Sequence, residues 1–457
     1  MPHTYSIVGL GKLGASMAAA IASRGFDVIG VDINHVAVDR LNAGHAPVQE
    51  TDLDALIAAN RSRLRATTSH ADAIRGSQIT FVIVPTPSDA TGAFSLQYAA
   101  WAFGEIGAAL KEKAGYHLVV LTSTVLPGAT RHGLLPILEE RSGKRCGRDF
   151  GLCYSPEFIA LGSVIRDFLH PDFTLVGESD ARAGQMLEEA YAEFLPDRPP
   201  CRRMSLENAE LTKISLNAYV TTKITFANML ADLCERIPGG DVDVVSGALG
   251  LDGRIGRKYL TGALGYGGPC FPRDNVALGF MARALGTEAP LPDATDRTNR
   301  SLAATVLERI GVSVQHGQTV AVLGLAYKPH SHVIEESQGI ALALELARHG
   351  ARVVAHDPLA GGAAAFALRD QCVILDSIRE CLDQASVVII TTPDPAYRAL
   401  VAADFGAGTH RVTVVDCWRI LADTFAGHPS ITYVPLGRSV NDQQNEDRLA
   451  TLWRHAD

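Results

Sequence analysis

The sequence predicts an α/β protein with two Rossmann-like, doubly wound parallel-sheet domains joined by a long central helix. Three observations predict this fold class. Apolar runs of strand length alternate with helical segments in both halves of the chain. Each half opens with a strand, a glycine-containing turn, a helix and a second strand that ends in an acid, and a long segment free of proline and glycine lies between them. We expect domains at residues 1–200, 201–310 and 311–457.

In the first half, an apolar strand at residues 5–9 runs into GLGKLG (9–14), a helical run, and a second strand that ends at Asp32. This context turns the weak GxGxxG pattern into a strong signal for a dinucleotide-binding unit. The alternative is a tight strand-to-helix turn without a ligand. No lysine or arginine occurs at residues 33–36 to neutralise a 2′-phosphate, so Asp32 favours NAD over NADP.

Further apolar strands at 78–87, 116–125 and 149–158 end in polar or proline-rich residues, at the sheet edge where such folds bind ligands. The segment 205–237 is helical in pattern and long for one globular helix, so we expect a connecting element that can be broken once. It places Glu210, Lys213 and Asn217 on one face. A lysine beside an amide can polarise a substrate oxygen, and the alternative is a solvated helix face.

The second α/β unit begins near residue 317, and its second strand ends in Asp357. Its turn, GLAYKP (324–329), lacks the GxGxxG glycines, so we expect a substrate domain and not a second dinucleotide site.

Composition excludes several function classes. Of the 457 residues, 47% are hydrophobic and 20% are charged, as in ordinary soluble proteins, and the net charge of -9 argues against non-specific binding to nucleic acid. The start of the chain lacks a signal-peptide pattern, and no apolar run reaches the roughly 18 residues of a membrane helix. The eight cysteines form no CxxC and no zinc spacing. We expect a cytoplasmic protein with no nucleic-acid, membrane or metal partner, and a solvated loop around His330 and His332.

One cysteine stands out. The loop GALGYGGPCFPRDN (262–275) places four glycines before Cys270, which Arg273 and Asp274 follow closely. Glycine lets the backbone approach a ligand, so this loop indicates a nucleophile held against a substrate. The alternative is a small buried hydrophobe in a turn. Glu157 ends a strand and is a candidate general base, or a surface acid.

These segments together resemble the UDP-glucose/GDP-mannose dehydrogenase family. The matching motifs, in family order, are GLGKLG (9–14), PTP (85–87), STVLPGAT (123–130), SPEF (155–158), AELTKISLNA (209–218), LDGRIGRKYL (251–260), GYGGPCFPRD (265–274), VLGLAYKP (322–329) and HDP (356–358). The resemblance implies oxidation of the C6 alcohol of a nucleotide sugar to a carboxylate by two NAD in succession. Cys270 would form a thiohemiacetal and then a thioester, and the glycines would let the loop wrap the sugar.

The resemblance also implies a role for each matching residue. The catalytic set is Cys270, Lys213, Asn217, Asp274, Glu157 and Thr124. The cofactor-binding set is Gly9, Gly11, Lys12, Leu13, Gly14, Asp32, Thr86, Pro87, Thr124 and Arg273. The substrate-binding set is Glu157, Phe158, Lys213, Asn217, Arg254, Tyr259, Leu260, Gly267, Lys328 and Arg419. Arg254 would reach the neighbouring subunit's substrate, which implies a homodimer, and the three predicted domains would bind NAD, form the dimer and bind the UDP-sugar.

Two departures from the family pattern concern positions near NAD: Leu161 replaces an acid, and Glu335 replaces an arginine. The loop favours the UDP-glucose branch, with GDP-mannose and UDP-N-acetylmannosamine (UDP-N-acetylhexosamine) dehydrogenases as alternatives. A two-electron hydroxyacid dehydrogenase, or an NAD-sensing protein that has lost turnover, would not need Cys270.

Overall fold

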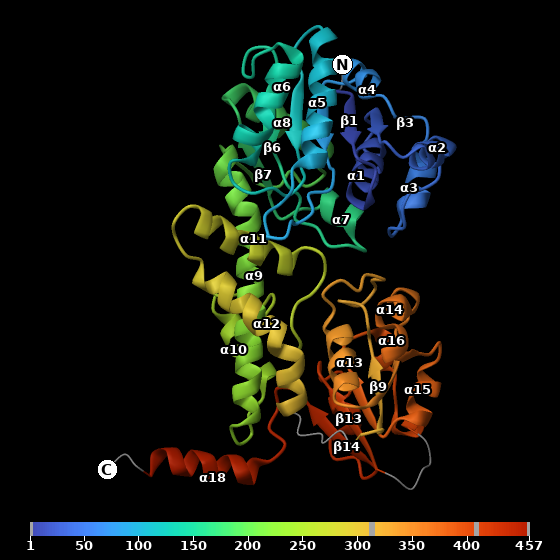
Figure 1. The fold of residues 1–457 in the computed structure, drawn as a ribbon, viewed down its shortest axis with the longest axis vertical. Helices are drawn as coiled ribbons and strands as arrows, with labels where there is room; N and C mark the ends of the chain where they lie inside the picture. The colour runs from blue at the N-terminus through green and yellow to red at the C-terminus, as the bar shows by residue number, and fades with distance from the viewer. Residues whose placement is uncertain (1–2, 310–315, 406–410, 455–457) are drawn as a thin grey trace. The chain divides into compact units, whose positions relative to one another are not determined.

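The computed structural model describes residues 3–309, 316–405 and 411–454. The chain divides into two units, Met1–Leu216 and Asn217–Asp457, each with its own sheet (Figure 1). No helix of the described residues is long and apolar enough to cross a membrane.

The first unit is built on an eight-stranded sheet in the order β3-β2-β1-β4-β5-β6-β7-β8. All neighbouring strands are parallel except β6 and β7. The strands are β1 Tyr5–Val8, β2 Val28–Val31, β3 Leu64–Thr67, β4 Ile79–Val82, β5 Leu118–Leu121, β6 Gly151–Tyr154, β7 Thr174–Glu178 and β8 Cys201–Ser205. The first six follow the order of a doubly wound dinucleotide-binding sheet.

Helices cover both faces of this sheet, which explains why its strands are apolar throughout. Ile7 packs into the core on one face, with α1 and α8, while the next residue, Val8, packs into the core on the other, with α4, α5 and α6. The helices are α1 Lys12–Ser23, α2 His35–Ala43, α3 Leu53–Ala59, α4 His70–Gly76, α5 Gln97–Glu112, a π-helical turn Ala129–Leu134, α6 Leu135–Ser142, α7 Val164–Leu169 and α8 Ala181–Phe194.

The long central helix α9 spans Leu206–Glu235 without interruption, so the break that the sequence allowed is not present. The boundary between the two units falls inside α9. Lys213 and Asn217 are therefore one helical turn apart on the same side of one continuous helix.

The second unit contains the end of α9 followed by three further helices, α10 Val242–Leu251, α11 Phe271–Ala284 and α12 Pro290–Arg309. Its six-stranded sheet has the order β11-β10-β9-β12-β13-β14, and every pair is parallel. The strands are β9 Thr319–Leu323, β10 Arg352–His356, β11 Val373–Ile374, β12 Val387–Ile390, β13 Val412–Asp416 and β14 Ile431–Pro435. This repeats the strand order of the first six strands of unit one and confirms the predicted two-sheet fold class.

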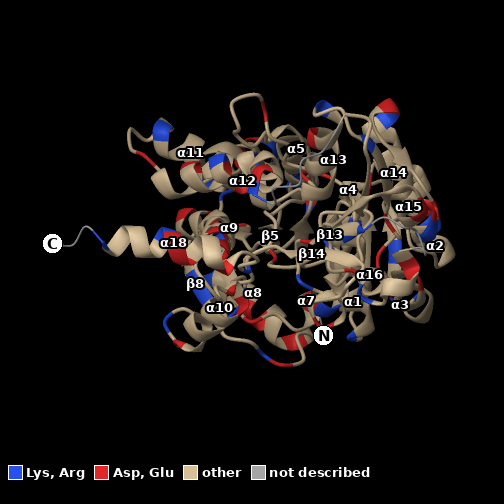
Figure 2. Ribbon diagram, turned by 90° about the horizontal axis from the view of Figure 1, so that it is seen from below, with Lys and Arg blue, Asp and Glu red and all other residues tan. Residues whose placement is uncertain are grey.

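The remaining helices of the second unit accompany this sheet, and apolar cores lie on both of its faces. They are α13 Gln338–Arg348, α14 Gly361–Leu368, α15 Ile378–Gln384, α16 Pro395–Arg398, α17 Ala422–Phe425 and α18 Asp442–Trp453, with 3₁₀ turns at Arg369–Gln371 and Ala402–Phe405. Figure 2 shows acidic and basic residues intermixed along the helices of both units.

Candidate active site

The GLGKLG turn gives each glycine a different role. Gly9 has φ +97°, and a Cβ on it would overlap the carbonyl of Ile83; a Cβ on Gly14 would overlap the carbonyl of Gly9. Apart from chain neighbours, no described atom lies within 4 Å of the position that a Cβ on Gly11 would occupy. Gly9 thus permits the tight turn, Gly14 permits close packing of α1 on β1, and Gly11 leaves its side open to a pyrophosphate. The turn therefore fits a dinucleotide.

Neighbouring residues shape the same edge of the sheet. Asp32 accepts from the backbone N–H of Leu10 (2.7 Å) and of Asn34 (2.8 Å) through different carboxylate oxygens. Thr86, buried between two exposed prolines, donates its hydroxyl to the carbonyl of Thr124 (2.7 Å). The rest of the predicted cofactor set in this unit also lies at this edge: Lys12 and Leu13 open α1, and Pro87 follows β4.

Glu157 and Lys213 meet in the first unit. The ammonium of Lys213 donates to the backbone carbonyl of Glu157 (2.7 Å) and lies 4.7 Å from the ring centre of Phe158. Burial raises the pKa of Glu157 to about 7, against the opposing charge of Lys213. A carboxyl with this pKa exchanges a proton near neutral pH, as a general base requires.

Glu210 does not join this cluster. Its carboxylate accepts from the backbone N–H groups of Gly128 (2.6 Å) and Thr130 (2.8 Å), and the side chain is fully buried. Glu210 therefore holds the loop of the STVLPGAT segment in place.

Asn217 and Asp274 meet in the second unit. The side-chain amide of Asn217 donates to Asp274 (2.6 Å), and both side chains are buried. The guanidinium of Arg273 lies 3.7 Å from the other carboxylate oxygen of Asp274. Asp274 also donates its backbone N–H to the carbonyl of Cys270 (2.9 Å). The structure thus joins three predicted residues to the turn that carries the cysteine.

Cys270 is the N-cap residue of α11 and is exposed. None of the eight cysteines, all of which the structure describes, is in a disulfide, and the other seven are buried or half-buried. Burial raises the pKa of all seven other thiols, Cys146, Cys153, Cys201, Cys234, Cys372, Cys381 and Cys417. Cys270 is therefore the most exposed of the eight thiols.

The glycines before Cys270 make room for protein contacts, and the expectation that they also let the loop wrap the sugar stays a prediction. A Cβ on Gly265 would overlap the side chain of Asn299, and one on Gly267 would overlap the carbonyl of Glu336. Gly268 has φ +82°, and its Cβ would lie 2.7 Å from the ring of Tyr327. The absence of side chains lets the loop pack against neighbouring segments of the same unit.

The remaining substrate candidates differ in their surroundings. Arg254 is 88% exposed and pairs with Asp252 (2.6 Å). Tyr259 has φ +68° and is half-exposed, while Leu260 is buried. Lys328 lies 5.7 Å from the ring centre of Tyr327.

The side chain of Arg419 is 1% exposed and donates hydrogen bonds to Asp243 and to the carbonyls of Thr261, Gly262 and Leu436. Of the two departures from the family pattern, Leu161 is half-buried, and Glu335 exposes its side chain while its carbonyl accepts from the backbone of Gly268 (2.8 Å).

Sequence reasoning missed two buried asparagines that hydrogen-bond the backbone of the glycine-rich segment, Asn228 on α9 and Asn299 on α12, and a half-buried acid on α10, Asp243, which pairs with Arg419. A single polar residue in a helix gives no signal that distinguishes it from a solvated one.

Among the described residues, no group of three histidine, cysteine or acidic side chains could hold a metal ion. The acid of the second turn, Asp357, accepts from Leu325 and Ala326 and from two residues that follow it.

Comparison with known proteins places this geometry in a family. Three models of the UDP-glucose/GDP-mannose dehydrogenase family match the chain: the NAD binding domain at residues 3–195, the central domain at 207–301 and the UDP binding domain at 321–423. The chain is 37% identical over 420 residues to UDP-glucose 6-dehydrogenase AglM of Haloferax volcanii, covering 91% of this chain and 96% of that one. It is 33% identical to GDP-mannose 6-dehydrogenase of Pseudomonas putida over 86% of this chain and 92% of that one.

Among solved structures, a UDP-glucose dehydrogenase from Pyrobaculum islandicum matches with a TM-score of 0.85 and 33% identity, covering 96% of this chain and 98% of that one. A GDP-mannose dehydrogenase from Pseudomonas aeruginosa matches with a TM-score of 0.53 and 30% identity over 94% and 99% of the two chains. With all three domain models matched in order and curated relatives matched over nearly their full length, the chain belongs to the UDP-glucose/GDP-mannose dehydrogenase family of nucleotide-sugar 6-dehydrogenases and carries its NAD-binding domain.

Proposed function

We propose that this protein oxidises the C6 alcohol of UDP-glucose to the carboxylate of UDP-glucuronate in two NAD-dependent steps through a covalent bond to Cys270. The observation that carries the proposal is the exposure of Cys270, alone among eight cysteines, at the start of α11. The buried Asn217–Asp274 pair is bonded to the first turn of that same helix.

NAD, when bound at the GLGKLG turn, supplies the hydride acceptor for each oxidation. The chain's residues handle the rest of the chemistry. As the alcohol becomes an aldehyde, its hydroxyl proton leaves for a base or for water. The thiolate of Cys270 then adds to the C6 carbonyl carbon, and the carbonyl electron pair becomes an oxyanion that Lys213 and Asn217 stabilise.

Loss of a second hydride from C6 converts this thiohemiacetal into a thioester. Water then attacks the thioester carbon while Glu157 takes one of its protons. The C–S bond breaks to release the thiolate of Cys270 and the carboxylic acid, which loses the second proton to solvent as the carboxylate. The pKa of Glu157, raised to about 7 by burial, suits this task because the carboxyl can accept and return a proton near neutral pH.

UDP-glucose is supported by the GYGGPCFP loop and by TM-scores of 0.85 to a UDP-glucose dehydrogenase and 0.53 to a GDP-mannose dehydrogenase, while sequence identity does not separate the two, at 37% and up to 36%. GDP-mannose and UDP-N-acetylhexosamines remain the alternatives, because relatives acting on GDP-mannose match over similar lengths. The absence of disulfides among the eight cysteines suits a reducing cytoplasm.

We further propose that the protein works as a homodimer. α9 exposes Tyr219, Phe226, Met229 and Leu233, whose spacings of seven, three and four place them in one stripe. Exposed apolar stripes of this kind mark interfaces, and a second copy of the chain can cover the stripe by two-fold symmetry. Arg254 extends from the end of α10 and would contribute to the partner's substrate site.

A substrate panel tests the function. UDP-glucose, UDP-N-acetylmannosamine, GDP-mannose and a hydroxyacid are each incubated with NAD, and NADH formed per molecule of substrate consumed is counted. The proposal expects two NADH per UDP-glucose and the highest kcat/KM for that sugar. One NADH per molecule indicates a two-electron dehydrogenase, none with any substrate indicates a protein without turnover, and a preference for GDP-mannose moves the assignment to that branch.

A further inference from the structure

The glycine-rich segment that leads to Cys270 is held along its backbone by buried polar side chains from outside the segment. We propose that Arg419, Asn228 and Asn299 are positioning residues that fix this segment and thereby Cys270, and that Arg419 acts in this way and not as a substrate ligand. The effect of these three residues on catalysis rests on the proposed function.

Arg419 uses all its hydrogen-bonding capacity within the protein. A guanidinium has five N–H donors. Nε and one Nη2 hydrogen donate to the two carboxylate oxygens of Asp243 (2.8 and 3.0 Å), and the other Nη2 hydrogen donates to the carbonyl of Thr261 (3.0 Å). Nη1 donates to the carbonyls of Gly262 (2.8 Å) and Leu436 (2.7 Å). A bond to a substrate phosphate would therefore require Arg419 to give up one of these.

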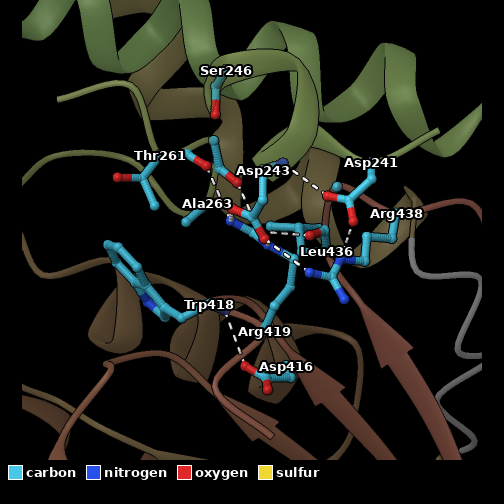
Figure 3. A network of polar contacts seen from close by, with 12 residues as sticks. Asp241, Asp243, Ser246, Thr261, Ala263, Asp416, Trp418, Arg419, Leu436 and Arg438 are labelled. Carbon is cyan, nitrogen blue, oxygen red and sulfur yellow. Dashed lines mark hydrogen bonds and ion pairs between the residues drawn. The ribbon is translucent and has the colours of Figure 1, made fainter. Parts of the chain in front are cut away.

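The same contacts join three parts of the second unit (Figure 3). Arg419 follows β13, and Asp243 lies in the first turn of α10. Gly262 begins the glycine-rich segment, and Thr261 directly precedes it. Burial pushes the pKa of Asp243 upward, but the hydrogen bonds and charges of Arg419 and Arg438 bring it below its ordinary value. Arg419 adopts φ +58°, a conformation that a non-glycine residue keeps only when its surroundings impose it.

Asn228 and Asn299 continue the support toward Cys270. Asn228 accepts from the N–H of Ala263 (2.9 Å) and donates to the carbonyl of Leu264 (3.1 Å). Asn299 both accepts from the N–H and donates to the carbonyl of Tyr266, at 2.9 Å each. Each buried amide thus satisfies two backbone groups of the segment, as a neighbouring strand would.

The consequence is a fixed position for the nucleophile. A thiol that captures an aldehyde between two oxidations must lie within bonding reach of C6 before the aldehyde diffuses away, and small displacements of a reacting group reduce rates strongly. The side chains that hold residues 261–266 limit the movement of the chain that enters the Cys270 turn. Loosening them should impair capture of the aldehyde more than binding of the substrate.

The experiment compares Arg419→Lys, Asp243→Asn and Asn299→Asp with Asn445→Ala. Asn299→Asp keeps the acceptor for the Tyr266 N–H, replaces the donor to the Tyr266 carbonyl by an oxygen, and places a buried carboxylate against that carbonyl. Asn445 is a matched control because it is also a buried asparagine whose side-chain amide is hydrogen-bonded, to Glu235, Ser439 and Arg448, and none of these residues belongs to the segment. The readouts are kcat, KM, NADH per sugar, aldehyde trapped by a hydrazine, and hydrogen exchange of the peptide 261–270.

We expect the three test variants to lower kcat about tenfold or more with KM changed less than about threefold. NADH per sugar should fall from two toward one as trapped aldehyde appears, and exchange of the 261–270 amides should quicken. Asn445→Ala should keep two NADH per sugar. A lysine at 419 supplies a point charge but not the planar fork, so it should not restore the wild-type ratio.

A different result overturns the inference. If Arg419→Lys raises KM while NADH per sugar stays at two and Asp243→Asn is without effect, Arg419 is a substrate ligand. Unchanged exchange in residues 261–270 of all three variants would show that the contacts do not hold the segment. The hydrogen-exchange measurement needs no substrate, so its result does not depend on the proposed function. If the proposed function is wrong, no nucleotide sugar yields NADH.

Discussion

Replacing Glu157 with glutamine should disable thioester hydrolysis and at the same time stabilise the protein above neutral pH. Burial raises the pKa of this carboxyl from its ordinary 4.5 to about 7. Below pH 4.5 the carboxyl is protonated in the folded and unfolded states alike. Between pH 4.5 and 7 the folded state retains a proton that the unfolded state loses, so the free energy of unfolding falls as pH rises. Above pH 7 both states are ionised, and the free energy of unfolding falls no further on account of Glu157.

The difference between these two pKa values corresponds to an upper limit of about 3 kcal/mol. Because the side chain is half-buried and solvent screens its charge, we expect about 1–2 kcal/mol. Glu157→Gln removes the ionisation, so its free energy of unfolding relative to the wild type should rise by this amount between pH 5 and pH 8. Equilibrium urea unfolding of both proteins at the two pH values measures the difference.

Glu207→Gln is the matched control, because we expect it to change the free energy of unfolding in the opposite direction. The hydrogen bond from Arg131 holds the pKa of Glu207 below its ordinary value, so its ionised form stabilises the fold and its replacement should destabilise the protein at pH 8. The reasoning about Glu157 is refuted if Glu157→Gln gains no stability relative to the wild type between pH 5 and pH 8.

Three further outcomes follow from the site. Lys213→Ala should lower kcat on the order of a hundredfold or more, because Lys213 stabilises the oxyanion; a change under about threefold in steady-state assays would assign Lys213 to structure alone. The unmodified protein should prefer NAD over NADP by at least about tenfold in kcat/KM, because the carboxylate of Asp32 repels a 2′-phosphate. Asp32→Ser should reduce this difference, mainly by lowering kcat/KM for NAD. Equal kcat/KM for both cofactors in the wild type would show that Asp32 does not have this role. Arg254→Ala should raise KM, and heterodimers with Cys270→Ala should regain activity at one site; heterodimers that form without regaining it would place Arg254 in its own subunit's site.

The fold could be predicted from strands that are buried on both faces. The runs YSIV at β1 and LVVL at β5 are almost entirely apolar, as strands buried on both faces must be. The spacing of Gly9, Gly11 and Gly14 predicts the turn between β1 and α1. The strands that the sequence did not indicate include β8, CRRMS, and β11, which is two residues long. Both end their sheets, where polar or short segments are stabilised by pairing with a neighbour and not by their own pattern.

For the site, motif spacing and the resemblance to the family predict Cys270, Lys213, Asp274 and Glu157 without coordinates, and their catalytic roles stay predictions. The structure adds the contacts among these residues. The protein contacts of the glycines were not predictable, because the atoms near their Cβ positions come from Asn299 and from residues far along the chain. Whether a cation such as Arg419 faces a ligand or a carbonyl depends on tertiary contacts alone.

In the proposed reaction, Cys270 carries the substrate between two oxidations. Glu157→Gln should hydrolyse the thioester slowly, so the enzyme mixed rapidly with UDP-glucose and NAD should accumulate an acyl group. Peptide mass spectrometry of the quenched protein should find UDP-glucuronyl mass on Cys270, and none when Cys270→Ala is added to the same variant. Formation of NADH by Glu157→Gln with no adduct on Cys270, or with undiminished product from the Cys270→Ala protein, would contradict the claim.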